Sequence, residues 1–549
     1  MKKIKKIILL GAAFFGFLKL TNAQTGELYQ LFGNIGIVKT SFAGSTVYTS
    51  TAVQGDGKIV AAGYTWNGSN YDFLLVRYNT NGSLDITFGG NGKLITDFGS
   101  TSDYARSVAI QTDGKIVVAG SANDNFALAR YNTSGSLDNT FSADGKQTND
   151  FQGSDNATSV SIQKDGKMVL VGWVNDNFII VRYNTDGSLD NAFSGDGKQT
   201  APFSGPFRFS YSDRSVAIQS DGKIIIIGAA NEQFAVARYN TDGSIDSTFS
   251  GDGIQLTRVG EISFASTVAI QKDGKIVVAG RLAAPETNGG FGIVRYNTNG
   301  SLDLTFSNDG ILTSGYNLDY LHSIAIQDDG KIVAGGSFAN LNTDVGNNVG
   351  PNFALFRYNT NGTPDNTFNF DGIQITEITG ADNGIASIAI ANNKLYAVGT
   401  DQVSLNLGIV ASYMLDNPNN APAVKISIAY NIVRYTSPAL IKVDAIATDV
   451  NGTISKVQFY NGTTLVQTAY LFPYAYVWLN ARPGDYKLTA KATDNSGFST
   501  TSNAIHVVVE DNSLLPVGKI ASPVVNTPYT AFAAIPLIGK EKDYIRNFK

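Results

Sequence analysis

One motif recurs along most of this chain, and the recurrence constrains the fold more than any other feature. The segment Ser-Val-Ala-Ile-Gln-Thr-Asp-Gly-Lys-Ile-Val-Val-Ala-Gly, which begins at Ser107, is repeated with few changes. Successive Asp-Gly-Lys anchors lie 57, 52, 56, 52, 56 and 63 residues apart, the last being a degenerate copy at Asn392. The anchors begin at Asp56, Asp113, Asp165, Asp221, Asp273 and Asp329. Such a period indicates a repeat architecture built from one supersecondary unit.

Two further anchors keep register with the first. Arg-Tyr-Asn begins at Arg77, Arg130, Arg182, Arg238, Arg295 and Arg357. Gly-Ser-Leu-Asp, or a close variant, begins at Gly82, Gly135, Gly187, Gly243, Gly300 and Gly362. Because all three anchors repeat together, each unit is expected to have the same internal structure.

Each unit is predicted to contain four short strands. In the copy around Ser107 they fall at residues 107–111, 115–120, 125–131 and 144–151. The second is a continuous apolar run, which is typical of a strand buried on both faces. Asp-Gly between the first two strands supplies the positive φ of a tight hairpin. Four-stranded sheets repeated at this period predict the blades of a β-propeller.

The two ends of the repeat region complement each other. The seventh copy ends after its third strand, near Leu415, without the Gly-Ser-Leu-Asp element. The missing part occurs near the N-terminus, where residues 32–38 match residues 88–94. An open solenoid needs distinct caps rather than complementary halves. We therefore expect an all-β, seven-bladed propeller over residues 28–416, with an N-terminal strand closing the last blade.

The anchors resemble those of the delta-60 repeat family. These are bacterial exported proteins whose units carry Asp-Gly-Lys-Ile-Val-Val-Ala-Gly and Arg-Tyr-Asn followed by Gly-Ser-Leu-Asp. The resemblance covers residues 28–416. It implies a propeller fold and carries no general biochemical activity.

A different pattern follows the repeats. Residues 417–422 are rich in Asn and Pro and form a predicted linker. Longer alternating strands over residues 423–510 predict an Ig-like β-sandwich, with strands near residues 440–447, 454–460, 474–479, 486–492 and 505–509. Residues 484–494 resemble the region of bacterial Ig-like domains that contains a tyrosine corner. The role of the tail, residues 511–549, is left open.

The N-terminus and the composition predict an exported protein. Residues 1–23 have a Lys-rich start, a short apolar run and small residues at Thr21 and Ala23, the pattern of a bacterial-type signal peptide. We expect a secreted or cell-surface monomer with no membrane span after cleavage. The chain has no cysteine, two histidines and a formal net charge of −5, so disulfides, thiolate sites and nucleic-acid binding are not expected. No cofactor is predicted.

One motif has the spacing of a calcium loop. Asn184, Asp186 and Asp190 lie around Gly187 as the oxygen ligands of such loops do. The position of Asp186 is also occupied by Asn and Ser in other repeats, which suits a turn held by Asx side chains better than a charged site. We therefore favour a turn and predict no metal. The repeated arginines are likewise expected to be structural and to join neighbouring blades.

A functional site is expected where the repeat symmetry is broken. The connections between second and third strands, and between blades, carry most of the variation and several exposed aromatic residues. Variable loops on a rigid scaffold commonly form binding surfaces. The predicted ligand-binding residues are Trp66, Tyr71, Trp173, Phe207, Arg208, Phe209, Tyr211 and Arg281.

These features favour a non-enzymatic extracellular binding or adhesion scaffold with a protein or glycan partner. The alternative is a carbohydrate-active hydrolase or lyase with a carboxylate pair at the mouth of the channel. Its candidates are Asp103, Asp155 and Asp319, each expected four residues before a first strand. A third hypothesis is a purely structural surface-layer component, and the sequence does not distinguish it from the binding scaffold.

Overall fold

The structure is a computed structural model, and the regular elements among the residues that it describes are all β-strands. It describes residues 25–99, 101–175, 177–203, 215–284, 287–314, 320–338, 352–378, 384–401, 407–415, 421–428, 434–449, 454–494 and 498–511. None of these residues belongs to a helix that could cross a membrane. The chain divides into two compact units, residues 1–419 and 420–549, and each is described by itself.

The first unit contains seven four-stranded antiparallel sheets among its described residues. The first three consist of β2 (Thr46–Val53), β3 (Ile59–Trp66), β4 (Tyr71–Tyr78) and β5 (Lys93–Thr96); β6 (Asp103–Ile110), β7 (Ile116–Ala122), β8 (Asn125–Tyr131) and β9 (Lys146–Asn149); and β10 (Asp155–Ile162), β11 (Met168–Val174), β12 (Asn177–Tyr183) and β13 (Lys198–Thr200). The next three consist of β14 (Val216–Ile218), β15 (Ile224–Ala230), β16 (Gln233–Tyr239) and β17 (Ile254–Thr257); β18 (Ile262–Ile270), β19 (Ile276–Ala284), β20 (Thr287–Tyr296) and β21 (Ile311–Thr313); and β22 (Tyr320–Ile326), β23 (Ile332–Phe338), β24 (Asn352–Tyr358) and β25 (Ile373–Thr376). The remaining sheet consists of β26 (Ile385–Ala391), β27 (Lys394–Asp401), β28 (Leu407–Met414) and β1 (Ile37–Thr40).

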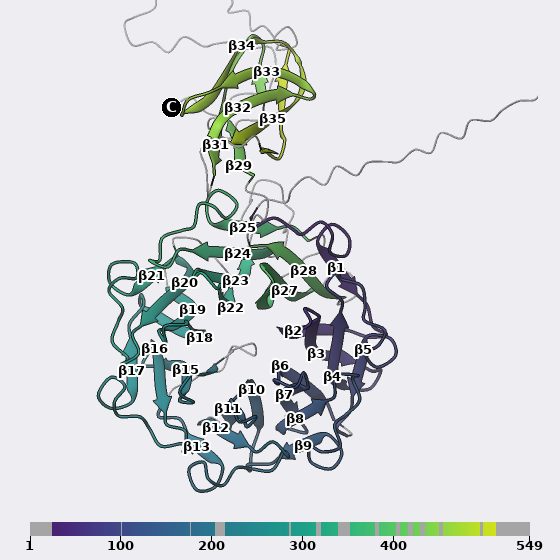
Figure 1. Cartoon of the computed structure of the whole chain (residues 1–549), viewed down its shortest axis with the longest axis vertical. Coiled ribbons are helices and arrows are strands. Elements are labelled where there is room, and N and C mark those ends of the chain that lie inside the picture. Colours follow the sequence, from purple (N-terminus) through teal and green to yellow (C-terminus); the bar gives the residue numbers. More distant parts are fainter. Residues whose placement is uncertain are drawn as a thin grey trace, which may run out of the picture. The chain divides into compact units, whose positions relative to one another are not determined.

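The sheets are arranged as the blades of a propeller. Their first strands lie toward the centre and their fourth strands at the rim (Figure 1). Each first strand contacts the first strand of the next sheet, and β26 contacts β2, so the series closes on itself. The N-terminal strand β1 pairs antiparallel with β28, with Ile37 opposite Ala411 and Thr40 opposite Gly408. The predicted closure by an N-terminal strand is confirmed.

A β-bulge explains the glycine of the Val-Val-Ala-Gly motif. The register of β6 against β7 shifts between Ala105 and Ser107, opposite Gly120. A Cβ atom on Gly120 would lie 1.9 Å from the main-chain oxygen of Tyr104. Any side chain at this position of the motif would clash with the main chain, so only glycine fits. The ladder also continues past the bulge, so β6 begins four residues earlier than the predicted strand 107–111.

Hydroxyl groups next to the bulges join the first strands to one another. The amide of Val108 donates to Ser50 Oγ at 3.2 Å, and the amide of Val160 donates to Ser107 Oγ at the same distance. The same contact joins β26 to β2, where the amide of Thr51 donates to Ser387 Oγ at 3.0 Å. These buried hydrogen bonds satisfy main-chain donors that no sheet ladder could reach.

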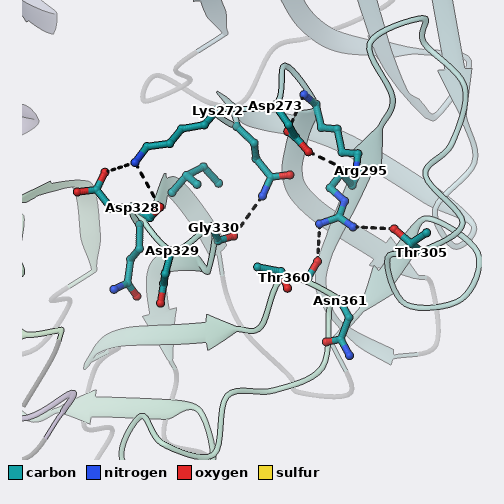
Figure 2. Close-up of a pocket in the computed structure, with 13 residues that line it drawn as sticks. Lys272, Asp273, Arg295, Thr305, Asp328, Asp329, Gly330, Thr360 and Asn361 are labelled. Carbon is teal, nitrogen blue, oxygen red and sulfur yellow. Dashed lines mark hydrogen bonds and ion pairs between the residues drawn. The ribbon is translucent and has the colours of Figure 1, made fainter. Parts of the chain in front are cut away.

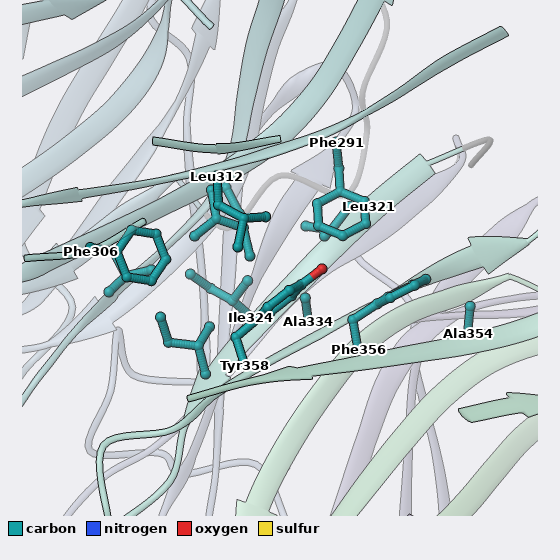
Figure 3. Close-up of a cluster of buried hydrophobic side chains, with 13 residues drawn as sticks. Phe291, Phe306, Leu312, Leu321, Ile324, Ala334, Ala354, Phe356 and Tyr358 are labelled. Carbon is teal, nitrogen blue, oxygen red and sulfur yellow. The ribbon is translucent and has the colours of Figure 1, made fainter. Parts of the chain in front are cut away.

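The hydrophobic core lies between neighbouring sheets. Figure 3 shows one such cluster, in which Phe291 of β20 lies against Phe356 of β24, with ring centroids 5.1 Å apart. Leu321 and Ile324 of β22 belong to the same buried cluster. Because neighbours cover both faces of each sheet, the second strands are mainly apolar and buried, as the sequence predicted for the run that became β7.

The second unit has an Ig-like pair of sheets. One consists of β29 (Ala423–Ile428), β31 (Ala439–Thr448) and β34 (Tyr474–Ala481). The other consists of β30 (Arg434–Thr436), β37 (Ile505–Glu510), β35 (Gly484–Asp494), β32 (Ile454–Asn461) and β33 (Thr464–Ala469), with β36 (Ser499–Thr501) beside β35. Tyr486 Oη donates to the main-chain oxygen of Arg482 at 2.8 Å, which is a tyrosine corner at the predicted place.

Candidate binding site at the junction of the first two sheets

The two faces of the propeller differ in how much they vary. Connections alternate between opposite ends of the strands in an antiparallel sheet. The turns between first and second strands and the connections between third and fourth strands therefore share one face, called here the repeat face. The connections between second and third strands and those between sheets share the other, called here the variable face.

On the repeat face, the repeated arginines join neighbouring sheets. Arg130 Nε donates to Asp138 Oδ2 at 2.8 Å, and its guanidinium lies 4.8 Å from the centroid of the Phe141 ring. Its Nη1 donates to the main-chain oxygen of Thr185 in the next sheet. The same arginine–aspartate pair, called here the latch, recurs at Arg77, Arg182, Arg238, Arg295 and Arg357. The predicted structural role of these arginines is confirmed.

The latch stabilises an ionised aspartate. Burial alone would raise the pKa of Asp138. Hydrogen bonds from Thr140 and the charges of Lys115 and Arg130 outweigh this effect and lower the pKa to about 2. The carboxylate is therefore charged at any pH at which the protein is expected to function.

A recess beside the latch recurs with the repeat. Figure 2 shows the copy between β18–β21 and β22–β25, about 470 Å³ in volume, with Arg295 and Asp273 in its wall. Gln271 Nε2 donates to the oxygen of Gly330 across it at 3.1 Å. A second recess of about 400 Å³, lined by the corresponding residues, lies between β6–β9 and β10–β13. These recesses follow from the repeat and do not mark one position as special.

The calcium-loop candidates take part in a turn and in a latch. Asp186 Oδ1 accepts hydrogen bonds from the amide and hydroxyl of Ser188, at 2.9 and 2.6 Å. Asn184 Nδ2 donates to Ser188 Oγ at 3.1 Å. Asp190 Oδ2 accepts from Arg182 Nε at 2.6 Å. These contacts are those of an Asx turn followed by a latch.

Two predicted binding residues on the variable face belong to a group of aromatic side chains. Trp66, at the end of β3, is 37% exposed and meets Tyr71 edge to face, with ring centroids 5.2 Å apart. Tyr71 contacts Tyr64 at 5.3 Å and Tyr104 of the next sheet at 5.6 Å. We call Tyr64, Trp66, Tyr71 and Tyr104 the aromatic cluster. It spans the junction of the first two sheets.

An arginine completes the cluster. Arg106 comes from the bulge of β6, and its guanidinium lies 5.5 Å from the centroid of the Tyr64 ring and 5.2 Å from that of Tyr104. Burial raises the pKa of Tyr64, and Arg106 partly offsets this effect. The cluster is thus a neutral aromatic surface with one cation held against it.

The hairpin after Trp66 is ordered by asparagine side chains. Asn67 Oδ1 accepts from the amide of Ser69 at 2.8 Å, and Asn67 Nδ2 donates to Asp72 Oδ2 at 2.8 Å. Asn70 Nδ2 donates to the main-chain oxygen of Thr101 at 2.9 Å. The hairpin is therefore tied both to its own sheet and to the segment that leads into the next one.

The other predicted binding residues lie elsewhere or outside the described residues. Trp173 of β11 is half-buried against Phe178, with ring centroids 5.0 Å apart, and borders a cavity of about 20 Å³, space for one water molecule. Arg281 of β19 is half-buried opposite Phe264 of β18. The predicted residues Phe207, Arg208, Phe209 and Tyr211 lie outside the described residues.

The expected position of the channel-mouth carboxylates is corrected by the structure. Asp103 and Asp155 are the first residues of β6 and β10, not residues ahead of a first strand. Their exposed fractions are 0% and 1%. The difference arises because the strands extend past the bulge and carry both side chains into the contact with the preceding sheet. Asp319 lies outside the described residues.

Asp103 instead belongs to a group of three carboxylates. Asp72 of β4, Asp97 after β5 and Asp103 of β6 each place one carboxylate oxygen within 4.8 Å of the others. We call them the acidic trio. Burial, with repulsion from Asp72 and Asp97, raises the pKa of Asp103 to about 6, although the amide of Phe98 donates a hydrogen bond to it.

The sequence did contain a signal for the acidic trio. Asp72 precedes Phe73, and the residue before the corresponding Phe in the next three repeats is Asn125, Asn177 or Gln233. A comparison of the repeats at this position singles out Asp72. Tyr64, Tyr104 and Arg106 lie on strands rather than loops, so a search for variable loops does not find them.

Comparison with family models covers both units. Six segments match a model described as "Domain of unknown function (DUF5122) beta-propeller", at residues 54–88, 111–141, 163–193, 219–249, 271–306 and 327–368. A model described as a bacterial Ig domain matches residues 422–490. No curated protein matches the sequence.

Several solved structures are similar to this chain. Fibronectin(III)-like modules of CbhA from Clostridium thermocellum share 29% identity over 16% of this chain and 94% of theirs, with a TM-score of 0.15. An extracellular domain described as part of a hybrid two-component system of B. thetaiotaomicron shares 10% identity over 86% of this chain and 58% of its own, with a TM-score of 0.38. The Nup133 β-propeller domain of Vanderwaltozyma polyspora shares 9% identity over 69% of this chain and 100% of its own, with a TM-score of 0.36.

Proposed function

We propose that this chain, a DUF5122 β-propeller repeat protein with a bacterial Ig domain after the repeats, is an exported scaffold that binds a ligand on the variable face of its propeller. Its propeller occupies residues 28–416 and its Ig-like domain residues 423–510. A β-propeller joined to a bacterial Ig domain fits a binding scaffold. The signal peptide at residues 1–23 lies outside the described residues and stays a prediction.

The aromatic cluster is the observation that supports this proposal most. The repeat face presents the same latch in six sheets and similar recesses at two junctions, whereas the cluster occurs where the first two sheets meet. Trp66 is exposed, and its ring packs edge to face against the ring of Tyr71. A rigid aromatic side chain with polar neighbours is the common composition of an energetic hot spot.

The chemistry around Trp66 favours a glycan as the ligand. An aromatic face can stack on the C–H groups of a sugar ring, while amide groups can bind its hydroxyls. Asn70 in the adjacent hairpin has such an amide, since its Nδ2 carries a second hydrogen beside the one that it donates to the main-chain oxygen of Thr101. A peptide segment is the alternative ligand.

No observation in the described part of the chain favours the hydrolase or lyase alternative. A general acid must reach the bond that it protonates. Asp103 and Asp155 are buried in the contacts between sheets, so neither can contact a glycosidic oxygen in this structure.

Binding can be tested with a glycan array and a peptide library, followed by calorimetry on the best ligand. Trp66→Ala and Tyr71→Ala should each weaken binding at least about tenfold, because truncated aromatic hot spots commonly cost about 2 kcal/mol or more. Leu304→Ala is a matched control, since Leu304 is an apolar side chain on the repeat face that is 66% exposed.

The melting temperature separates binding from folding. Trp66→Ala should leave it within about 2 °C of wild type, because the side chain is exposed. The proposal fails if Leu304→Ala weakens binding as much as Trp66→Ala, or if ligands bind Trp66→Ala with unchanged affinity.

A further inference from the structure

Two of the three carboxylates of the acidic trio are buried, and the third, that of Asp97, is exposed. The exposed fractions of Asp72 and Asp103 are 3% and 0%. Asp72 Oδ1 and Asp103 Oδ1 are both buried and have no hydrogen-bond partner among the described residues. A buried carboxylate oxygen without a partner is costly unless something positive neutralises it.

The other oxygens are already held in place. Asp72 Oδ2 accepts from Asn67 Nδ2 at 2.8 Å, and Asp103 Oδ2 accepts from the amide of Phe98 at 2.7 Å. Asp97 Oδ1 accepts from the amide of Gly99 at 2.6 Å. These contacts fix the orientation of each carboxylate, and they leave Asp72 Oδ1 and Asp103 Oδ1 without a hydrogen-bond partner among the described residues.

Nearby side-chain cations have other partners. The ammonium of Lys146 donates to the main-chain oxygen of Asp97 at 3.1 Å rather than to a carboxylate. The guanidinium of Arg106 lies against the rings of Tyr64 and Tyr104. The charge of Lys146 lowers the pKa of Asp103, but the hydrogen bond of its ammonium goes to the main chain.

We propose that the acidic trio binds a calcium ion. Two oxygens that both lie about 2.4 Å from one ion are at most about 4.8 Å apart. The trio meets this limit, since its ligand oxygens lie within 4.8 Å of one another. Calcium tolerates irregular oxygen geometry, whereas magnesium keeps several bound waters. Because hydrogen bonds already orient the three carboxylates, a cation that accepts irregular geometry fits the site better.

The neighbouring junction provides a natural comparison. There Asp155 Oδ2 accepts from the amide of Phe151 at 2.6 Å, and Asp150 Oδ1 accepts from the amide of Gln152 at 2.7 Å. The position of Asp72 is taken by Asn125. The scaffold is the same, but one carboxylate is missing. The acidic trio thus differs from its neighbour by the charge that a divalent cation would require.

A calcium ion bound by the acidic trio would also affect the aromatic cluster. Asp72 follows Tyr71 and Asp103 precedes Tyr104, and these two rings lie 5.6 Å apart. An ion held by both sheets would fix the spacing of the two tyrosines. The inference does not depend on the proposed function, because the ion can bind whether or not the cluster takes a ligand.

The test uses the whole mature protein after treatment with a chelator. Calorimetric titration with CaCl2 should show one equivalent bound per chain, and calcium should raise the melting temperature by mass action. Terbium, which replaces calcium, should show luminescence sensitised by the nearby tyrosines. Asp72→Asn should weaken calcium binding at least about tenfold, whereas Asp155→Asn at the neighbouring junction should leave it unchanged.

Three results would overturn the proposal. The first is the absence of binding heat and of any thermal shift with millimolar calcium. The second is equal calcium affinity in wild type and Asp72→Asn. The third is a stronger response to MgCl2 than to CaCl2. Far-UV circular dichroism of Asp72→Asn confirms that the variant is folded, and Trp66→Ala should bind calcium normally even if it binds no glycan.

Discussion

Replacement of Asp138 by asparagine tests the latch between sheets. The side chain is buried and accepts hydrogen bonds from Arg130 Nε at 2.8 Å and from Thr140 Oγ1 at 2.7 Å. Its pKa is about 2, against 3.8 for an unperturbed carboxyl. At about 1.4 kcal/mol for each pKa unit, the ionised form is favoured by about 2.5 kcal/mol. The variant loses further stability because the amide NH2 group of asparagine, itself a donor, must face donors such as Arg130 Nε and Thr140 Oγ1.

We therefore expect Asp138→Asn to reduce the free energy of unfolding by about 2–4 kcal/mol at pH 7, near the range for a broken buried ion pair. The first unit has roughly 400 residues. At about 2.1 cal/mol/K per residue, the loss corresponds to a melting temperature lower by about 2–5 °C. Differential scanning calorimetry measures it directly.

The pH dependence of the stability difference tests whether the latch acts through the charge of Asp138. The pKa of Asp138 is lower in the folded protein than in the unfolded chain, so its contribution is present above about pH 4 and is lost as the pH falls toward 2. The stability difference between wild type and Asp138→Asn should shrink over this window. Asp144→Asn, which changes an exposed turn carboxylate in the same repeat, should cost less than about 0.5 kcal/mol. A difference that is the same at pH 2 and pH 7 would refute the electrostatic account of the latch.

Two further predictions concern closure of the ring and the bulge glycine. Deletion of residues 28–42 should destabilise the propeller severely or cause aggregation, since it removes β1 and the fully buried Phe32. Loss of one buried Phe alone costs about 3–5 kcal/mol. An unchanged melting temperature in calorimetry would contradict closure by β1. Gly120→Ala should cost at least about 1–3 kcal/mol in urea unfolding, because the new Cβ would lie 1.9 Å from the oxygen of Tyr104. Gly55→Ala, where nothing lies within 4 Å, should be near neutral, and equal losses in the two variants would exclude a steric cause.

The repeat pattern predicted much of the fold because each anchor has a local cause. Asp-Gly sets a hairpin, with Gly114 at a φ of +83°, and the apolar run after it needs cover on both faces. The structural role of Arg130 followed from its presence in almost every repeat. The bulge near Ala105 was not predicted, because no local residue preference requires it. It is set by contacts between neighbouring first strands.

The candidate site was only partly predictable for a similar reason. Trp66 and Tyr71 lie at a variable hairpin, so they could be identified from the sequence. Tyr104 and Arg106 join them only because the second sheet packs against the first, which periodicity within one repeat does not reveal. The acidic trio likewise comes from three segments, and the charge of Asp72 has meaning only beside Asp103.

The pairing of β1 with β28 has a consequence for biosynthesis. The partner of Ile37 is Ala411, so β1 emerges from the ribosome about 370 residues before the strand that it pairs with. At about 5–20 residues per second, this wait lasts about 20–70 s. A strand left without a partner for so long is a target for pairing with other chains, and short length and a central lysine reduce that risk. The strand has four residues and carries Lys39, whose ammonium finally pairs with Asp401 at 2.9 Å when the last sheet is complete.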